Sequence, residues 1–315
     1  MTLPDHIKRR LALPLIAAPM FTVSGPDLVI AACRNGVIGG FPTANCRSID
    51  ELDIWLKRIR TEISSEDAPF CANLIMRREE TEDEIELLLR HGVELVLTSV
   101  GSPRPAVERL HAAGALVFAD VATLRHARRA IESGVDGLVL LSAGAGGQTG
   151  WINGMSFARA VRKMFDGIII LSGGISDGAT LLAAQTIGCD LAMMGTPFIA
   201  TDESLAPAGY REMVVASEID DVILTSAITG LASNMLRPSL IGAGLDPNAL
   251  SASIHDAMQA ETGAAPAGVP KRWKDLWSAG HSVSGVDAIV PVAERIARIR
   301  EEYRAAQQEM RALLE

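Results

Sequence analysis

The chain has 315 residues, 48% of them apolar, with 29 Lys+Arg against 38 Asp+Glu and a formal net charge of -9. An apolar fraction near one half excludes a disordered chain, and this length suits one large α/β domain or two ordinary ones. The acidic balance argues against a nucleic-acid partner, because nucleic-acid-binding domains present a basic face. No apolar stretch reaches the roughly 18 residues that a membrane helix needs, so we expect no membrane partner.

The first apolar run, residues 11–18, follows three basic residues and superficially resembles a secretory signal. We interpret it as the first core strand, because the architecture derived below needs a strand here. The four cysteines are scattered without a C-x-x-C pair, a pattern typical of neither a disulfide framework nor a zinc site. We therefore expect a cytoplasmic protein with buried thiols and no metal.

One unit recurs along the first two thirds of the chain: a helix-like stretch, a glycine, and then a short apolar run. The glycines of this unit are Gly36, Gly92, Gly114, Gly134 and Gly188. Glycine commonly ends a helix, and short apolar runs without alternation suit strands that are buried on both faces of a parallel sheet. Residues 15–18, 70–75 and 168–172 add three more such runs. Eight alternating strands and helices predict a (β/α)8 TIM barrel, with an open doubly wound sheet as the structural alternative.

The rhythm of the repeat breaks after about residue 204. We therefore assign residues 1–204 to the barrel and predict that residues 205–282 form a small helical insertion that covers the barrel mouth. Residues 283–315 read as a charged amphipathic helix that closes the barrel domain.

The strongest chemical signal lies after the seventh and eighth predicted strands, which end at Gly173-Gly174 and Gly195-Thr196. Active sites of such barrels lie at the carboxyl ends of the strands, and these two loops are the usual phosphate site. Glycines there let backbone N–H groups approach an anion closely. The sequence thus predicts a phosphate-bearing ligand, and tight turns that simply need glycine are the structural alternative.

The loop after the sixth predicted strand, residues 142–150, is also rich in glycine. Such a loop is costly in conformational entropy, so we expect either that something approaches its backbone closely or that it moves. A plain flexible surface loop is the alternative.

These segments resemble the nitronate monooxygenase family, also called 2-nitropropane dioxygenases, which are FMN-dependent (β/α)8 barrels related to flavin enoyl-acyl-carrier-protein reductases. The resemblance covers nearly the whole chain. It is carried by Asn73 and by residues 17–20, 36–40, 145–150, 172–178 and 194–201, while residues 278–281 are similar to an Ala-Gly-Gln segment near the family's C-terminus.

The resemblance implies an FMN cofactor. It places the backbone of Ala18, Pro19 and Met20 against the isoalloxazine ring, with the Asn73 side chain hydrogen-bonded to the flavin. On the phosphate side it places Gly146, Gly147, Gly174, Gly195 and Thr196, which agrees with the anion site predicted from glycine placement.

Two positions depart from the family. Gln148 stands where many relatives carry the histidine regarded as the general base, and glutamine cannot exchange a proton at physiological pH. Oxidation of an already anionic nitronate does not need that base, whereas neutral nitroalkanes should be poor substrates. Asp120 stands where some relatives place a lysine near the flavin. Asp120 and His281 are the remaining candidate proton donors, the latter if its segment folds over the mouth.

The leading functional hypothesis is an FMN-dependent oxidoreductase that oxidises an anionic nitronate with O2. The alternative is an NAD(P)H-dependent FMN reductase of a quinone or an activated alkene such as an enoyl thioester, in which Gln148 holds the carbonyl. An inosine-monophosphate-dehydrogenase-like barrel would need a cysteine within residues 142–150, which contain none. A non-catalytic flavin-binding or partner-binding protein is a fourth hypothesis. The expected partner is a small-molecule substrate, and a homodimer is the candidate assembly.

Overall fold

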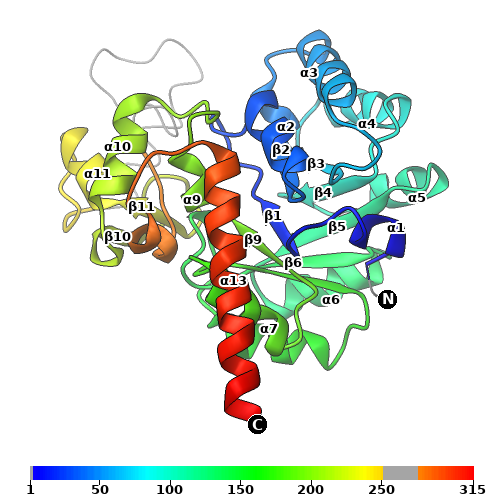
Figure 1. Ribbon diagram of the computed structural model, residues 1–315. Coiled ribbons are helices and arrows are strands. Elements are labelled where there is room, and N and C mark those ends of the chain that lie inside the picture. Colours follow the sequence, from blue (N-terminus) through cyan, green and yellow to red (C-terminus); the bar gives the residue numbers. More distant parts are fainter. Residues whose placement is uncertain (1–2, 251–275) are drawn as a thin grey trace.

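The computed structural model describes residues 3–250 and 276–315 and contains a closed barrel of eight parallel strands (Figure 1). In order around the barrel these strands are β1 (Leu15–Ala17), β2 (Ile38–Pro42), β3 (Phe70–Ile75), β4 (Leu95–Ser99), β5 (Leu116–Val121), β6 (Gly137–Leu141), β8 (Ile168–Ser172) and β9 (Leu191–Met194). β1 pairs in parallel with both β2 and β9, which closes the barrel. The predicted (β/α)8 barrel is confirmed, and the open sheet is excluded.

Helices alternate with these strands along the chain. The main ones are α2 (Pro26–Arg34), α3 (Ile49–Glu62), α4 (Thr81–Arg90), α5 (Arg104–Ala112), α6 (Leu124–Glu132), α7 (Gly154–Arg162), α8 (Gly178–Thr186) and α13 (Val292–Leu314), and α1 (Asp5–Lys8) precedes the barrel. All five glycines of the recurring unit have a positive φ, between 57° and 98°. They end the helices in the left-handed conformation, as the repeat predicts.

The amino ends of two strands are fastened by carboxylates. Asp136, just before β6, accepts a hydrogen bond from the backbone N–H of Val117 at 2.7 Å and lies 2.8 Å from His111 Nε2. Asp190, just before β9, accepts from the backbone N–H of Ile169 at 2.9 Å and from Arg162 Nη2 at 2.6 Å. At the amino end of the barrel, therefore, both carboxylates have hydrogen-bond partners from the protein itself.

Apolar side chains fill the barrel interior below the carboxyl ends of the strands, among them Ile16, Ile38, Leu95, Phe118, Val139 and Ile170. A larger apolar layer lies between the strands and the surrounding helices. All four cysteines are buried and free, and burial raises the pKa of each thiol to about 12. The cysteines are therefore core residues, as predicted.

A serine begins one of the helices, and a threonine lies inside the start of the next. Ser48 caps α3, and its hydroxyl accepts from the backbone N–H of Glu51 at 3.2 Å. Thr81 is the first residue of α4, and the cap of that helix is Glu80. Thr81 is buried and its hydroxyl bonds the carbonyl oxygens of Arg78 and Ile75, so it fastens the loop that leaves β3.

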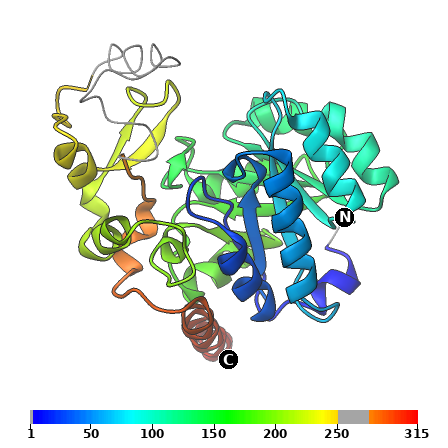
Figure 2. The ribbon, with the colours of Figure 1, turned by 90° about the horizontal axis from the view of Figure 1, so that it is seen from above.

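The described part of the region 205–282 contains helices and also a small sheet that the sequence did not reveal. The helices in its described part are α10 (Ala208–Ala216) and α11 (Arg237–Gly242). The strands β10 (Val222–Thr225) and β11 (Ser233–Leu236) join β7 (Gly147–Gln148) in an antiparallel sheet of order β10-β11-β7. Together these elements form a lobe beside the barrel (Figure 2). Residues 251–275 of the predicted insertion lie outside the described residues.

The last helix, α13, packs its apolar face on the barrel. Val292, Ile296 and Ile299 are buried there, whereas most of the following turns are exposed, and the helix extends past the barrel to the C-terminus (Figure 1). The predicted amphipathic closing helix is thus present. None of the helices within residues 3–250 and 276–315 combines the length and the apolar character of a membrane span.

Candidate functional site

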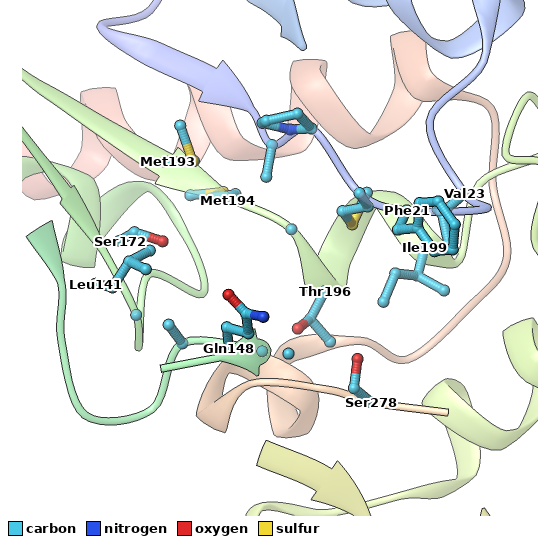
Figure 3. A pocket seen from close by; sticks show the side chains of 18 of the residues that line it. Phe21, Val23, Leu141, Gln148, Ser172, Met193, Met194, Thr196, Ile199 and Ser278 are labelled. Atoms are coloured by element: carbon cyan, nitrogen blue, oxygen red, sulfur yellow. The ribbon is translucent and has the colours of Figure 1, made fainter. Parts of the chain in front are cut away.

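A cavity of about 860 Å³ lies over the carboxyl ends of the barrel strands (Figure 3). Its wall is formed by residues at the carboxyl ends of all eight barrel strands, together with β7 and the lobe residues Tyr210 and 276–279. Cofactor and small-molecule sites commonly occupy about 300–1,000 Å³. The cavity therefore has the size and the position of a barrel active site.

Charged side chains are nearly absent from the wall. Among the described residues that line the cavity, the titratable ones are Asp120 and Tyr210, and no Lys, Arg or His is present. The Tyr210 hydroxyl donates to the carbonyl oxygen of Ser278 at 2.5 Å, and burial raises the pKa of its phenol to about 12. An anionic ligand group in this cavity would therefore have to be bound by backbone N–H groups rather than by a cation.

The two predicted anion loops meet at one side of the cavity. Gly173 and Gly174 have φ values of 115° and 71°, and a Cβ on Gly174 would meet no atom within 4 Å. Gly195 and Thr196 lead from β9 into the short helix α9 (Thr196–Ile199), which occupies the place of the short extra helix common in barrel phosphate sites. Gly174 suits a phosphate because its backbone borders open space, whereas a Cβ on Gly173 would lie 2.6 Å from Oγ of Ser142 and one on Gly195 would lie 3.3 Å from Sδ of Met20.

The glycine-rich loop after β6 is fastened by the chain itself. A Cβ on Gly144 would lie 2.7 Å from Nδ1 of His281, and one on Gly146 would lie 2.8 Å from the backbone nitrogen of Gly280. Asn234 Nδ2 also donates to the carbonyl oxygen of Ala145 at 2.8 Å. The expected close approach is thus made by residues 279–281, and the alternative of a plain flexible surface loop is wrong. Gly146 and Gly147 still line the cavity.

Gln148 reaches the cavity because β7 pairs with the lobe strand β11. Its register partner is Ser233, which fixes the backbone on which the amide is carried. In Figure 3 the amide of Gln148 and the hydroxyl of Thr196 face the same space. The Thr196 hydroxyl accepts a hydrogen bond from the backbone N–H of Gly280 at 2.9 Å, so that side of the site is held rigidly.

Asn73 presents an acceptor to the cavity. Its Nδ2 donates to the carbonyl oxygen of Leu97 and to Oγ of Ser99, both at 3.0 Å. An amide group carries two N–H donors, so both are used and only Oδ1 is left for a ligand. Because the carbonyl of Leu97 can only accept, the amide cannot be turned round without losing a bond. Asn73 is therefore suited to a ligand N–H group.

A buried acid that the sequence did not single out supports Asn73. Glu84 on α4 is 2% exposed, and burial raises the pKa of its carboxyl. The Thr43 hydroxyl, in η1 (Thr43–Asn45), lies 2.9 Å from the Glu84 carboxyl and 3.1 Å from the carbonyl oxygen of Asn73. A helical glutamate gives no signal of this role, because its position relative to β3 depends on the closed barrel.

Ala18, Pro19 and Met20 form an apolar wall that faces the methionines of β9. The backbone N–H of Ala18 donates to the carbonyl oxygen of Met194 at 2.8 Å. Buried Ser24 holds the turn, since its hydroxyl donates to the Ala18 carbonyl and accepts from the Met20 N–H, both at 3.0 Å. Figure 3 shows Met193 and Met194 along this side of the cavity. The wall suits a flat apolar ring.

The rim contains features that the sequence does not signal. Thr22 and Val100 line the cavity and have φ values of 60° and 51°, which β-branched residues rarely adopt. Such strained positions cluster at functional sites. On the lobe side, Tyr210 and Trp277 stack with ring centroids 5.2 Å apart and planes 10° apart. Phe21, Val23 and Ile199 gather nearby in Figure 3, so this part of the entrance is apolar.

The structure places the two predicted proton donors differently. His281, in η3 (His281–Gly285), is exposed and packs on Gly144, and it does not line the cavity. Asp120, the second-to-last residue of β5, pairs with Val139 of β6 and lines the cavity, and burial raises the pKa of its carboxyl to about 7. Of the two, only Asp120 is brought together with Gln148, Asn73 and the glycine loops. No group of His, Cys, Asp and Glu suited to a metal occurs in the part of the chain that the structure describes.

A closed barrel with a cavity of this size at its carboxyl end, and with glycine loops after its last two strands, defines a (β/α)8 barrel protein with a candidate active site. The model of the nitronate monooxygenase family matches residues 81–302. The chain therefore belongs to the nitronate monooxygenase family, as the resemblance predicts. The inosine-monophosphate-dehydrogenase-like alternative is set aside by this membership.

The names of individual relatives indicate different reactions. The chain is 27% identical to (3aS,4S,5R,7aS)-5-hydroxy-7a-methyl-1-oxo-octahydro-1H-indene-4-carboxyl-CoA dehydrogenase of Mycobacterium tuberculosis, over 72% of this chain and 64% of that relative. It thus spans somewhat less than two thirds of that protein. It is 24% identical to a nitronate monooxygenase of Paraburkholderia phytofirmans, over 95% of this chain and 94% of that one.

Solved structures share the fold. FabK from Thermotoga maritima superposes with a TM-score of 0.83 at 24% identity, covering 98% of this chain and 97% of that one. A nitroalkane oxidase from Streptomyces ansochromogenes gives 0.77 at 23% identity, covering 97% and 100%. At these identities the likeness establishes the barrel and its lobe rather than a substrate.

Proposed function

We propose that the protein is an FMN-dependent oxidoreductase that binds its cofactor in the cavity over the barrel. The phosphate would lie against the backbone of Gly174 and of Gly195–Thr196, and the ring against the wall of Ala18, Pro19 and Met20. Asn73 would accept a hydrogen bond from a ring N–H. FMN, when bound, supplies two-electron transfer, and the protein holds, polarises and shields it. What supports this is a large cavity whose polar wall is mainly backbone and amide.

The charge of the cavity guides the choice of substrate. Its described lining offers one carboxyl group and no cation, so an anionic nitronate would have no charged partner. A neutral thioester carbonyl needs only a hydrogen-bond donor, and the Gln148 amide supplies one. We therefore place NAD(P)H-dependent reduction of an activated alkene such as an enoyl thioester, which is the alternative in the sequence analysis, ahead of nitronate oxidation. The CoA thioester in the name of the mycobacterial relative points the same way.

Nitronate oxidation with O2 is the second candidate. It is supported by the family to which the chain belongs and by the Paraburkholderia relative, which aligns over nearly its whole length. It does not require a proton to be abstracted, so the absence of a histidine at Gln148 does not exclude it.

The proposal gives a role to the polar side chains and the aromatic pair of the cavity wall. Gln148 orients the carbonyl of the substrate, and Asp120 holds or releases a proton at its carboxyl oxygen. The aromatic pair Tyr210–Trp277 and the apolar rim exclude water when the substrate enters. Residues 205–282 would act as the cover of the barrel formed by residues 1–204 and 283–315. NADH or NADPH is the proposed electron donor.

Spectroscopy of the purified protein tests both the proposed FMN cofactor and the choice between the two candidate reactions. We expect a yellow protein that releases FMN on denaturation, and a colourless protein that cannot be reconstituted with FMN would refute the assignment. Under anaerobic conditions NADH or NADPH should bleach the flavin, and crotonyl-CoA should restore the colour. Direct bleaching by propane-2-nitronate, with no response to either nucleotide, would instead select the second candidate. Absence of turnover with either substrate class would favour a flavin-binding protein without catalysis.

A further inference from the structure

Asp120 is an acid in an unusual setting. It lies near the carboxyl end of β5, on the same inward face of the barrel as Phe118. Leu97, Val139 and Leu141, which line the same cavity, come from the two strands that flank β5. Its carboxyl group is thus held against an apolar floor and faces the space that the proposed function gives to the flavin.

Within residues 3–250 and 276–315, no charged side chain compensates this acid. The strands β4 and β6, which pair with β5, carry no titratable side chain. Across the cavity, Tyr210 stays neutral because burial raises the pKa of its phenol. Helices α5 and α6 pack on the outer side of β5, away from the cavity, and their charged or titratable residues are Arg104, Glu108, Arg109, His111, Arg125, His126, Arg128, Arg129 and Glu132. Desolvation alone therefore determines the proton affinity of Asp120.

A second negative charge in such a space is costly. With no cation in the described lining, a carboxylate and a negatively charged ring in one apolar cavity repel each other strongly. The coupled pair lowers its free energy by binding one more proton. Reduction of a flavin by two electrons and one proton leaves such a negative charge on the ring.

We infer that Asp120 takes up a proton when the bound flavin is reduced and releases it when the flavin is reoxidised. The inference rests on the proposed function. In the reductive step the donor gives two electrons, the flavin binds one proton, and a second proton from solvent forms an O–H bond on the Asp120 carboxylate. Reoxidation by the substrate removes the electrons and breaks that O–H bond. Asp120 would thereby store, beside the reaction, the proton that balances the charge of the reduced cofactor.

The test is the dependence of the flavin reduction potential on pH, measured anaerobically with a reductant and an indicator dye. Between pH 7.5 and 8.5 the wild-type holoprotein should take up two protons per two electrons. Asp120→Asn keeps the shape of the side chain but cannot bind the proton, so it should take up one. Glu132→Gln removes a carboxylate from the helix that follows the same strand, and it should keep the wild-type slope. Equal slopes for wild type and Asp120→Asn would overturn the inference.

A second measurement separates this inference from the proposed function. In the cofactor-free protein, an infrared band of a protonated carboxyl group should disappear with a midpoint near pH 7 and be missing in Asp120→Asn. Failure to bind FMN would refute the proposed function, whereas FMN binding with a one-proton slope in the wild type would refute the inference alone. The wild-type slope also decides the question if Asp120→Asn does not fold.

Discussion

The two ends of the barrel treat polar groups in opposite ways. At the amino end, Asp136 and Asp190 are bonded to backbone N–H groups and to basic side chains, and glycines such as Gly114 only end helices. At the carboxyl end, Asp120 has no ionic partner and Gly174 borders open space. Polar groups at the amino end stabilise the fold, whereas those at the carboxyl end are available to a ligand. This is the usual division in this fold.

The largest effect should come from filling the space beside Gly174. Gly174→Val places a branched side chain where the phosphate is proposed to bind and strains a residue with φ of 71°. Loss of two hydrogen bonds to a charged group, at about 1.5–3 kcal/mol each, corresponds to roughly 1,000-fold weaker FMN binding. Fluorescence titration with FMN measures this.

Gly114→Val is the matched control. Gly114 has a φ of 81° and open space around it, but it lies in the turn between α5 and β5, away from the cavity. It should destabilise the fold to a similar extent and leave FMN affinity unchanged. A comparable loss of FMN binding in both variants would show that backbone strain, and not phosphate contact, matters at Gly174.

Substitution of Gln148 should change the activity towards substrates and leave the affinity for FMN unchanged. Gln148→His supplies the missing base, so turnover of neutral nitroalkanes should rise by about 100-fold, the lower end of a general base's contribution. Gln148→Leu, which lacks the donor, should lower kcat/KM for an enoyl-CoA while FMN affinity stays the same. Steady-state kinetics at saturating FMN measure both. If neither variant alters either activity, Gln148 does not contact the substrate.

The sequence predicts the features that depend on local patterns and misses those that depend on contacts between distant segments. The repeated helix-glycine-strand unit predicts the barrel, and paired glycines predict the anion loops, because both signals are local. The sheet β10-β11-β7 was missed since its strands have at most four residues and one of them is Gly147–Gln148. The isolation of Asp120, the support of Asn73 by Glu84 and the outward position of His281 depend on contacts between distant segments. No local pattern encodes such contacts.

At the amino end, removal of a fastening acid should cost stability only. Asp190→Ala leaves the N–H of Ile169 and the Arg162 guanidinium without their partner, at a cost of about 2–3 kcal/mol in the free energy of unfolding. Urea denaturation measures this, and FMN affinity should not change. Glu309→Ala, on the exposed end of α13, should cost less than about 0.5 kcal/mol. Weaker FMN binding in Asp190→Ala would contradict the division between the two ends.

The last prediction concerns Asp120 and the pH dependence of stability in the cofactor-free protein. Burial raises the pKa of this acid from its usual 3.8 to about 7. The stability gained by binding the proton in the fold is complete below pH 4 and is lost as pH rises towards 7. Asp120→Asn should therefore gain stability relative to wild type across this window, by about 4 kcal/mol at about 1.4 kcal/mol per pKa unit, and keep that gain above it. A difference independent of pH would mean that the carboxyl group is not desolvated.

The most direct test of the account compares FMN with riboflavin, which lacks the phosphate, in binding titrations of the cofactor-free protein. Because backbone N–H groups at Gly174 and Gly195–Thr196 are proposed to bind the phosphate without help from a cation, FMN should bind about 100-fold more tightly or better. Equal affinities for the two flavins would show that these loops bind no phosphate, and the proposed cofactor site would be contradicted.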